Sequence, residues 1–221
     1  MPRDPRPTRD IILDASERRF AEKGFAGVSV REIATDAGLK NQASLYHHFK
    51  NKRTLYEAVL ARGLEPAVAI LAERAAMAGS TDPRTPLGRF VEDVFIDRIV
   101  DYLAQHPYLP RLIQRAGLDD GRYLRTTLTR LVRPLLTQGQ TILEMTEGSW
   151  DAQEVPHLAA GLYLMIFGYF ANAGLLEILI PEGPLAPAAI ERQRKFLRRA
   201  VVRLLSDAPT PPKPTVRKPS R

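Results

Sequence analysis

The fold is decided by residues 29–52, which read SVREIATDAGLKNQASLYHHFKNK. Ser29 and Glu32 have the spacing of a capping box, in which the serine hydroxyl accepts from the backbone N–H three residues on and the glutamate reaches back to the cap. A short helix is therefore predicted over 30–37. It has to end there, because Gly38 offers the left-handed conformation that closes a helix and turns the chain.

A second short helix fits residues 41–49, directly after the glycine turn. The apolar residues Ile33, Ala34 and Leu45 are placed to fix the packing of the two helices. Such a pair is the geometry of a helix-turn-helix, which offers its second helix to the major groove of DNA. Short helical hairpins also occur as plain scaffold, so the spacing alone leaves both interpretations open.

The rest of the chain keeps a helical periodicity, and no alternating strand pattern is found. The fold class is therefore predicted to be all-α. Gly24 is expected to end the first helix and Asn51 to cap the fourth, which Pro66 is expected to bend. The other helices are predicted over 8–23, 86–105, 108–117, 122–146, 153–179 and 187–206.

The composition describes an ordinary folded protein with basic ends. The chain has 221 residues, 44% of them hydrophobic, and a formal net charge of +7. Net charge is +4 over 1–62, −5 over 63–190 and +8 over 191–221. A surface for nucleic acid could lie at either basic end, since attraction needs only positive potential whereas recognition of sequence needs a shaped element.

Several chemistries are not expected. The chain has no cysteine, so disulfides, thiolate zinc sites and cysteine nucleophiles are excluded, which fits a cytoplasmic protein. The adjacent His47 and His48 lack a third ligand at suitable spacing, so no metal site is expected. No phosphate loop, nucleophile elbow or pair of catalytic carboxylates is recognisable, and we expect neither an enzyme nor a cofactor.

The N-terminal quarter resembles the TetR family of transcriptional regulators. The residues that carry the resemblance are Ile12-Leu13, Phe20-Ala21-Glu22-Lys23-Gly24-Phe25, Ser29 to Ala34, Ala37-Gly38-Leu39 and Leu45 to Lys52. Arg19 departs from the family pattern, which usually has an apolar residue there, and the stretch 38–46 is one residue longer than usual. The resemblance implies a DNA-binding domain followed by a larger helical domain for ligand binding and dimerisation.

We accordingly expect four segments. A flexible arm covers 1–7, with no secretory signal, and a three-helix helix-turn-helix domain covers 8–62. The regulatory and dimerisation domain covers 63–206. A disordered tail rich in proline and basic residues covers 207–221.

Double-stranded DNA is the expected partner of the helix-turn-helix. Asn41, Gln42 and Ser44 stand near the start of the second helix, where amide and hydroxyl groups can bond base edges, although each could instead cap the helix or face solvent. The Tyr46 hydroxyl is expected on phosphate with its ring packed inside, and His48 is expected in the core beside Leu45. The full predicted DNA-binding set is Arg31, Lys40, Asn41, Gln42, Ala43, Ser44, Tyr46, His47 and Lys52, of which Arg31, Lys40, His47 and Lys52 would contact phosphates.

The resemblance also implies a homodimer in which the last two long helices of each subunit form a four-helix bundle. The predicted interface residues are Gly161, Leu164, Gly168, Ala171, Leu175, Ile190, Leu197, Val201 and Leu204. The arginine-rich face of the last helix is expected to pair with the acidic middle of the chain.

In the family a small molecule bound in the larger domain changes the separation of the two DNA-reading helices, and an unidentified small-molecule effector is expected here. The candidate lining residues are Phe90, Phe95, Tyr102, His106, Tyr108, Tyr123, Met165 and Phe167. Most aromatic stripes in helical proteins are simply core, so each of these residues also has a structural explanation.

Two alternatives remain open at this point. Residues 158–176 form an uncharged run long enough for a transmembrane candidate, so the chain could be a membrane-tethered helical adaptor. Small residues along the run favour a buried or interfacial helix instead, without a membrane. The sequence also does not separate a ligand-controlled repressor from a regulator that acts without ligand.

Overall fold

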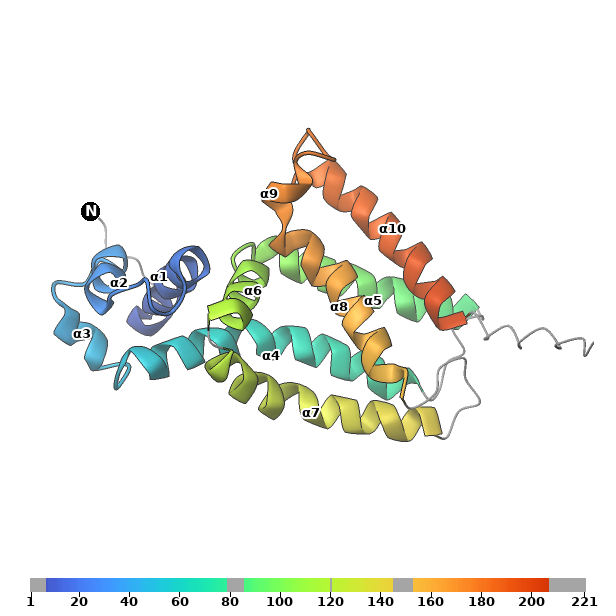
Figure 1. Ribbon diagram of the computed structural model, residues 1–221, viewed down its shortest axis with the longest axis horizontal. Helices are drawn as coiled ribbons and strands as arrows, with labels where there is room; N and C mark the ends of the chain where they lie inside the picture. Colours follow the sequence, from blue (N-terminus) through green and yellow to red (C-terminus); the bar gives the residue numbers. More distant parts are fainter. Residues whose placement is uncertain (1–6, 79–85, 120, 145–152, 207–221) are drawn as a thin grey trace, which may run out of the picture.

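The computed structural model describes residues 7–78, 86–119, 121–144 and 153–206, and in these ranges every regular element is a helix (Figure 1). The expected tail and almost all of the expected arm lie outside the described residues. The helices are α1 Thr8–Lys23, α2 Val30–Asp36, α3 Gln42–Tyr46, α4 Lys52–Ala78, α5 Pro86–Gln105, α6 Leu109–Asp119, α7 Arg122–Glu144, α8 Val155–Ala171, α9 Ala173–Leu176 and α10 Pro187–Ser206. The all-α prediction is confirmed.

Helices α1 to α3 form a small unit at the start of α4, and α5, α6 and α7 pack on α4, while α9 and α10 lie further from it (Figure 1). The α1 helix ends where predicted, because Gly24 adopts a positive φ of 71° and its N–H donates to the Phe20 carbonyl. The α4 helix begins where predicted, because the Asn51 side chain accepts from the Thr54 N–H at 2.9 Å. The proposed domain boundary at residue 62 falls inside α4, so one continuous helix joins the two units.

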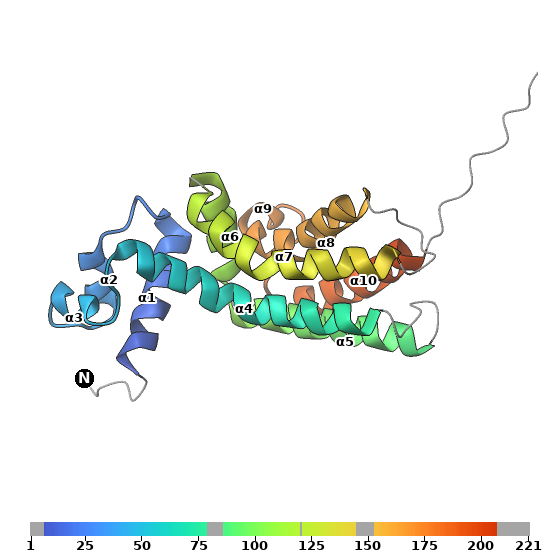
Figure 2. The same cartoon turned by 90° about the horizontal axis from the view of Figure 1, so that it is seen from below.

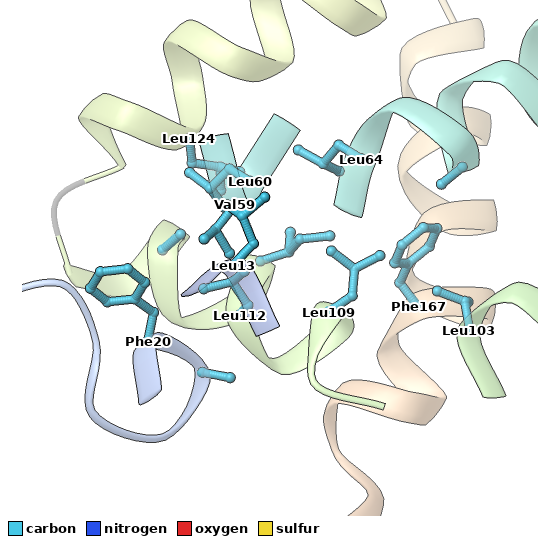
Figure 3. Close-up of a cluster of buried hydrophobic side chains, with 14 of the residues drawn as sticks. Leu13, Phe20, Val59, Leu60, Leu64, Leu103, Leu109, Leu112, Leu124 and Phe167 are labelled. Carbon is cyan, nitrogen blue, oxygen red and sulfur yellow. The ribbon is translucent and has the colours of Figure 1, made fainter. Parts of the chain in front are cut away.

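One hydrophobic core joins the small unit to the larger one. Figure 3 shows Leu13 and Phe20 of α1 beside Val59 and Leu60 of α4, with Leu112 of α6 closing the cluster. All five side chains are buried. Because these contacts cross from α1 to α6 as well as to α4, a movement of α6 reaches the small unit through packed side chains.

The last helix is held to α5 by ion pairs. Arg198 donates to both carboxylate oxygens of Asp97 at 2.6 Å, and Arg194 donates to Asp97 and to Asp101 at 3.2 and 2.6 Å. These contacts depress the pKa of Asp97 against the opposing effect of its burial. The expected pairing of the arginine face with acidic residues of the middle segment is confirmed.

The long apolar run is not one helix, contrary to the prediction of a single helix over 153–179. The α8 helix ends at Ala171, and Asn172 turns the chain into the short α9. The Asn172 side-chain amide donates to the Gly168 carbonyl at 2.8 Å, and the Asn172 backbone N–H donates to the same carbonyl at 3.1 Å. None of the described helices combines the length and the apolar character needed to cross a membrane.

Candidate nucleic-acid interface

The pair α2 and α3 is built by the local signals expected of it. The Ser29 hydroxyl accepts from the Glu32 N–H at 3.1 Å, and the Ser29 N–H donates to the Glu32 carboxylate at 2.8 Å. The bond from the Ser29 N–H, helped by Lys23, lowers the Glu32 pKa to about 2. Gly38 has a φ of +67° with open space where a Cβ would stand, so glycine is required there by backbone conformation alone.

Arg19, which departs from the family pattern, has a clear structural partner. Its guanidinium forms two hydrogen bonds with the Asp36 carboxylate, the one from the terminal nitrogen at 2.8 Å. These bonds lower the Asp36 pKa and raise that of Arg19. The ion pair ties the middle of α1 to the last residue of α2, so a polar contact replaces an apolar one at this position.

The two sides of α3 differ sharply. Leu45 is fully buried and Phe49, one turn further, is also buried, so these two residues anchor the segment in the core. Lys40, Gln42 and Ala43 are exposed, together with Asn41 and His47. Gln42 and Ala43 of α3 therefore offer an amide and a methyl group to a partner, and Lys40 and His47 add basic side chains on either side of the helix.

Two members of the predicted DNA-binding set are committed to capping. The Asn41 side-chain oxygen accepts from the Ser44 N–H at 3.0 Å and from the Ser44 hydroxyl at 3.2 Å. This is the alternative role considered for Asn41 from the sequence. The cap also starts α3 at Gln42, one residue later than predicted.

Two side-chain placements predicted from the sequence are wrong. The Tyr46 ring, expected to pack inside, is 46% exposed, and His48, expected in the core, is exposed. The reason is that α3 ends at Tyr46 rather than at residue 49. Only Leu45 and Phe49, four residues apart, point inward, while the residues between them turn outward.

The basic residues round this surface include several that the sequence did not single out. Arg31 is exposed as expected. The Lys52 ammonium lies 4.5 Å from the Phe25 ring centroid, and desolvation there lowers the Lys52 pKa. The missed residues are Arg9, whose guanidinium lies 5.2 Å from the Phe49 ring centroid, and Lys50, which is exposed. Only their charge could have indicated them, because Arg9 lies in the first turn of the first predicted helix and Lys50 lies just after the second helix of the predicted helix-turn-helix.

Three of the eight predicted ligand residues come together. Tyr102, His106 and Tyr108 help to line a cavity of about 660 Å³ between α1, α4 and the end of α5. The Tyr102 hydroxyl donates to the Gly63 carbonyl at 2.7 Å, and burial raises the Tyr102 pKa to about 12. Arg62 closes another side of the cavity and donates to carboxylates of α1 at 2.8 Å.

The other five candidates lie elsewhere. Phe167 is buried in the core and Phe95 and Met165 pack against it. Tyr123 packs on Phe25 and Tyr56 at the junction of α4 and α7. The side chain of Phe90 lies outside the described residues.

The predicted dimer residues divide between the surface and the protomer's own core. Leu164 and Leu175 are about two-thirds exposed and Gly161 is exposed, whereas Gly168, Ala171, Ile190 and Leu204 are half-buried. Leu197 and Val201 are buried in the same subunit, where α10 packs on α5, so their assignment to a dimer interface is wrong. Exposed apolar side chains missed by the sequence are Tyr163, Ile178, Leu179, Leu185 and Phe196.

Comparison with known proteins agrees with this geometry. Residues 12–59 match the family described as bacterial regulatory proteins, tetR family. The chain is 32% identical over 120 residues to the HTH-type transcriptional repressor SCO4008 of Streptomyces coelicolor, covering 54% of each chain. It is 30% identical over 175 residues to the probable HTH-type transcriptional regulator YttP of Bacillus subtilis, covering 78% of this chain and 82% of YttP.

A solved structure has the same fold over nearly the whole chain. The putative transcriptional regulator SCO4942 from Streptomyces coelicolor aligns over 90% of this chain and 98% of its own with a TM-score of 0.59 at 22% identity.

The sequence match to this chain spans only about half of SCO4008 and 28% of the KstR2 repressor of Mycolicibacterium smegmatis. Fold, helix pair and relatives together define a DNA-binding transcriptional regulator of the helix-turn-helix class. The chain belongs to the TetR family.

Proposed function

We propose that this protein is a homodimeric repressor that binds a palindromic operator through α3 and is released by a small molecule. The observation that carries the proposal is that Leu45 anchors α3 in the core while polar residues of α3 and basic residues flanking it are exposed. A recognition helix needs both, because its inner side fixes its orientation and its outer side must reach base edges.

Within this proposal the outer residues have different tasks. The Gln42 amide can bond an adenine edge in the major groove, and the Ala43 methyl can contact a thymine methyl. Lys40, His47 and Arg31 neutralise phosphates and set the register. Repression, rather than activation, is proposed because SCO4008 and KstR2 are named repressors.

Dimerisation is proposed to use the apolar surface of α8, α9 and the segment after them. Ile178 and Leu179 are 77% and 76% exposed, and Leu164 and Leu175 are 64% and 66% exposed. Exposed apolar patches of this kind mark contact with another protein. Two protomers joined there would present two α3 helices to one duplex, and their spacing would select a palindrome.

The effector is proposed to bind the cavity between α1, α4 and α5. Its walls come from both units of the molecule, since Asp14 and Arg18 belong to α1, Tyr102 belongs to α5 and His106 directly follows α5. A ligand that fits one relative position of α1 and α5 better than another would bias the separation of the two α3 helices.

The proposal is tested by selecting bound duplexes from a random pool and footprinting the result. The expected outcome is a palindrome with half-sites about one helical turn apart, bound more weakly as salt rises. Tyr46→Ala or Lys52→Ala should weaken binding to all duplexes about equally, and Gln42→Ala should relax preference at particular bases. Unchanged binding by the double variant Gln42→Ala with Lys52→Ala would overturn the assignment of α3.

A further inference from the structure

Three positive charges from two parts of the molecule gather round one pair of aromatic rings. The rings of Phe25, in the turn before α2, and Tyr123, in the first turn of α7, have centroids 4.8 Å apart. The Lys52 ammonium lies 4.5 Å from the Phe25 centroid. The guanidinium carbons of Arg53 and Arg122 lie 5.4 and 5.7 Å from the Tyr123 centroid. We call Lys52, Arg53 and Arg122 the junction cations.

The junction cations stand beside the proposed DNA surface. Lys52 is the first residue of α4, so the partial positive charge of that helix end adds to theirs. The α7 helix runs alongside α4, and its first turn lies toward α1 to α3 in both views (Figures 1 and 2). The first turn of α7 is therefore the part of that helix nearest to the proposed recognition surface.

The basic residues of the larger unit are concentrated close to Arg122 in the sequence. Although 63–190 is acidic as a whole, six of its ten basic residues fall within 109–133, against two acidic residues there. The six are Arg111, Arg115, Arg122, Arg125, Arg130 and Arg133. Acidic residues of α5 are instead engaged by α10, as with Asp97 and Arg198. Positive charge is thus concentrated on α6 and α7, which pack directly on the DNA-binding unit.

Packing of α7 on α4 does not by itself account for these arginines. Arg53 has a local partner, because it donates to Glu57 at 3.0 Å. Arg125 is exposed and forms no ion pair with any residue in the described ranges. It follows Arg122 by three positions, so the two side chains are neighbours on one side of α7.

We propose that Arg122 and Arg125 bind phosphates of the DNA backbone next to those contacted by Lys52. The regulatory unit would then contact DNA itself, in addition to α3. This inference rests on the proposed DNA-binding function. It also deepens that function, because a shift of α7 along α4 would alter DNA affinity without any movement inside the helix-turn-helix.

The test is the salt dependence of binding to a long random-sequence duplex, measured with the full chain. Removing one phosphate contact lowers the slope of log affinity against log salt by about 0.9, so Arg122→Ala or Arg125→Ala should lower it by about 2 for a dimer. Arg122→Lys should retain the slope, since it retains the charge. Arg130→Ala is the matched control, because Arg130 lies further along α7 with its side chain 63% exposed and faces Glu65 at 3.8 Å.

The outcomes separate the two proposals. If the wild-type protein binds and the slopes of Arg122→Ala and Arg125→Ala equal that of Arg130→Ala, the proposed phosphate contact from α7 is wrong, and the assignment of α3 is unaffected. Loss of stability by Arg122→Ala without a change in slope would likewise assign Arg122 to packing only, and overturn the inference. If the wild-type protein binds no duplex, the proposed function fails first.

Discussion

Leu45 gives the sharpest prediction about how α3 is held. It is the only buried side chain of this five-residue helix, and no part of it is exposed. Leu45→Ala removes its apolar contacts and leaves a cavity, which costs about 3 kcal/mol for a fully buried leucine. That is a large part of the ~5–15 kcal/mol that stabilises a typical domain. Since Leu45 is the buried residue within α3 itself and shares the anchoring of the segment only with Phe49, DNA binding should fall as well.

Gln42→Ala is the matched control, because Gln42 is an exposed residue of the same helix. It should change the free energy of unfolding by less than about 0.5 kcal/mol while altering base preference. Urea unfolding followed by circular dichroism, and binding to the selected duplex, separate the two effects. Equal loss of stability in both variants would refute the division of α3 into an anchoring side and a binding side.

Three further variants test other parts of the account. Gly38→Ala should lower the free energy of unfolding in urea by about 1–2 kcal/mol, because alanine is strained at a positive φ. Gly117→Ala, inside α6, should not lower it. Equal effects of the two substitutions would contradict this explanation. The Glu32 pKa is lowered from 4.5 to about 2, so the contribution of its carboxylate to stability is present above pH 4.5 and is lost as pH falls toward 2. Glu32→Gln should therefore reduce the dependence of the unfolding midpoint on pH over that window. An unchanged pH profile would assign the acid sensitivity to other groups. Ile178→Asp should give a monomer by sedimentation, whereas Leu118→Asp, equally exposed on α6, should remain a dimer; a dimeric Ile178→Asp would place the interface elsewhere.

Local features of the fold were predictable because their causes are local. Ser29 and Glu32 form their capping box, Gly38 adopts its positive φ and Asn51 caps α4, each within four residues of its partner. The family signature in the first quarter of the chain rests on the same local residues and the buried side chains between them. The class of fold and the position of the helix pair α2 and α3 therefore followed from the sequence.

The predictions that were wrong concern which other element a helix face packs against, because no local sequence pattern determines that. Leu197 and Val201 form an apolar stripe that would suit a partner subunit, but α5 of the same chain covers them. His48 and Tyr46 turned outward because α3 stops early. The break at Asn172 divided an apolar run that periodicity alone indicated as one helix.

The most direct test of DNA recognition by α3 uses the absence of cysteine from the chain. Ala43→Cys places the sole thiol on the exposed side of α3, and Leu118→Cys places it on α6, where Leu118 is 78% exposed. The rate of alkylation of each thiol is measured with and without the selected duplex. Strong protection of Cys at position 43 with no protection at 118 is the predicted result. Equal alkylation of Ala43→Cys in free and DNA-bound protein would contradict the central claim.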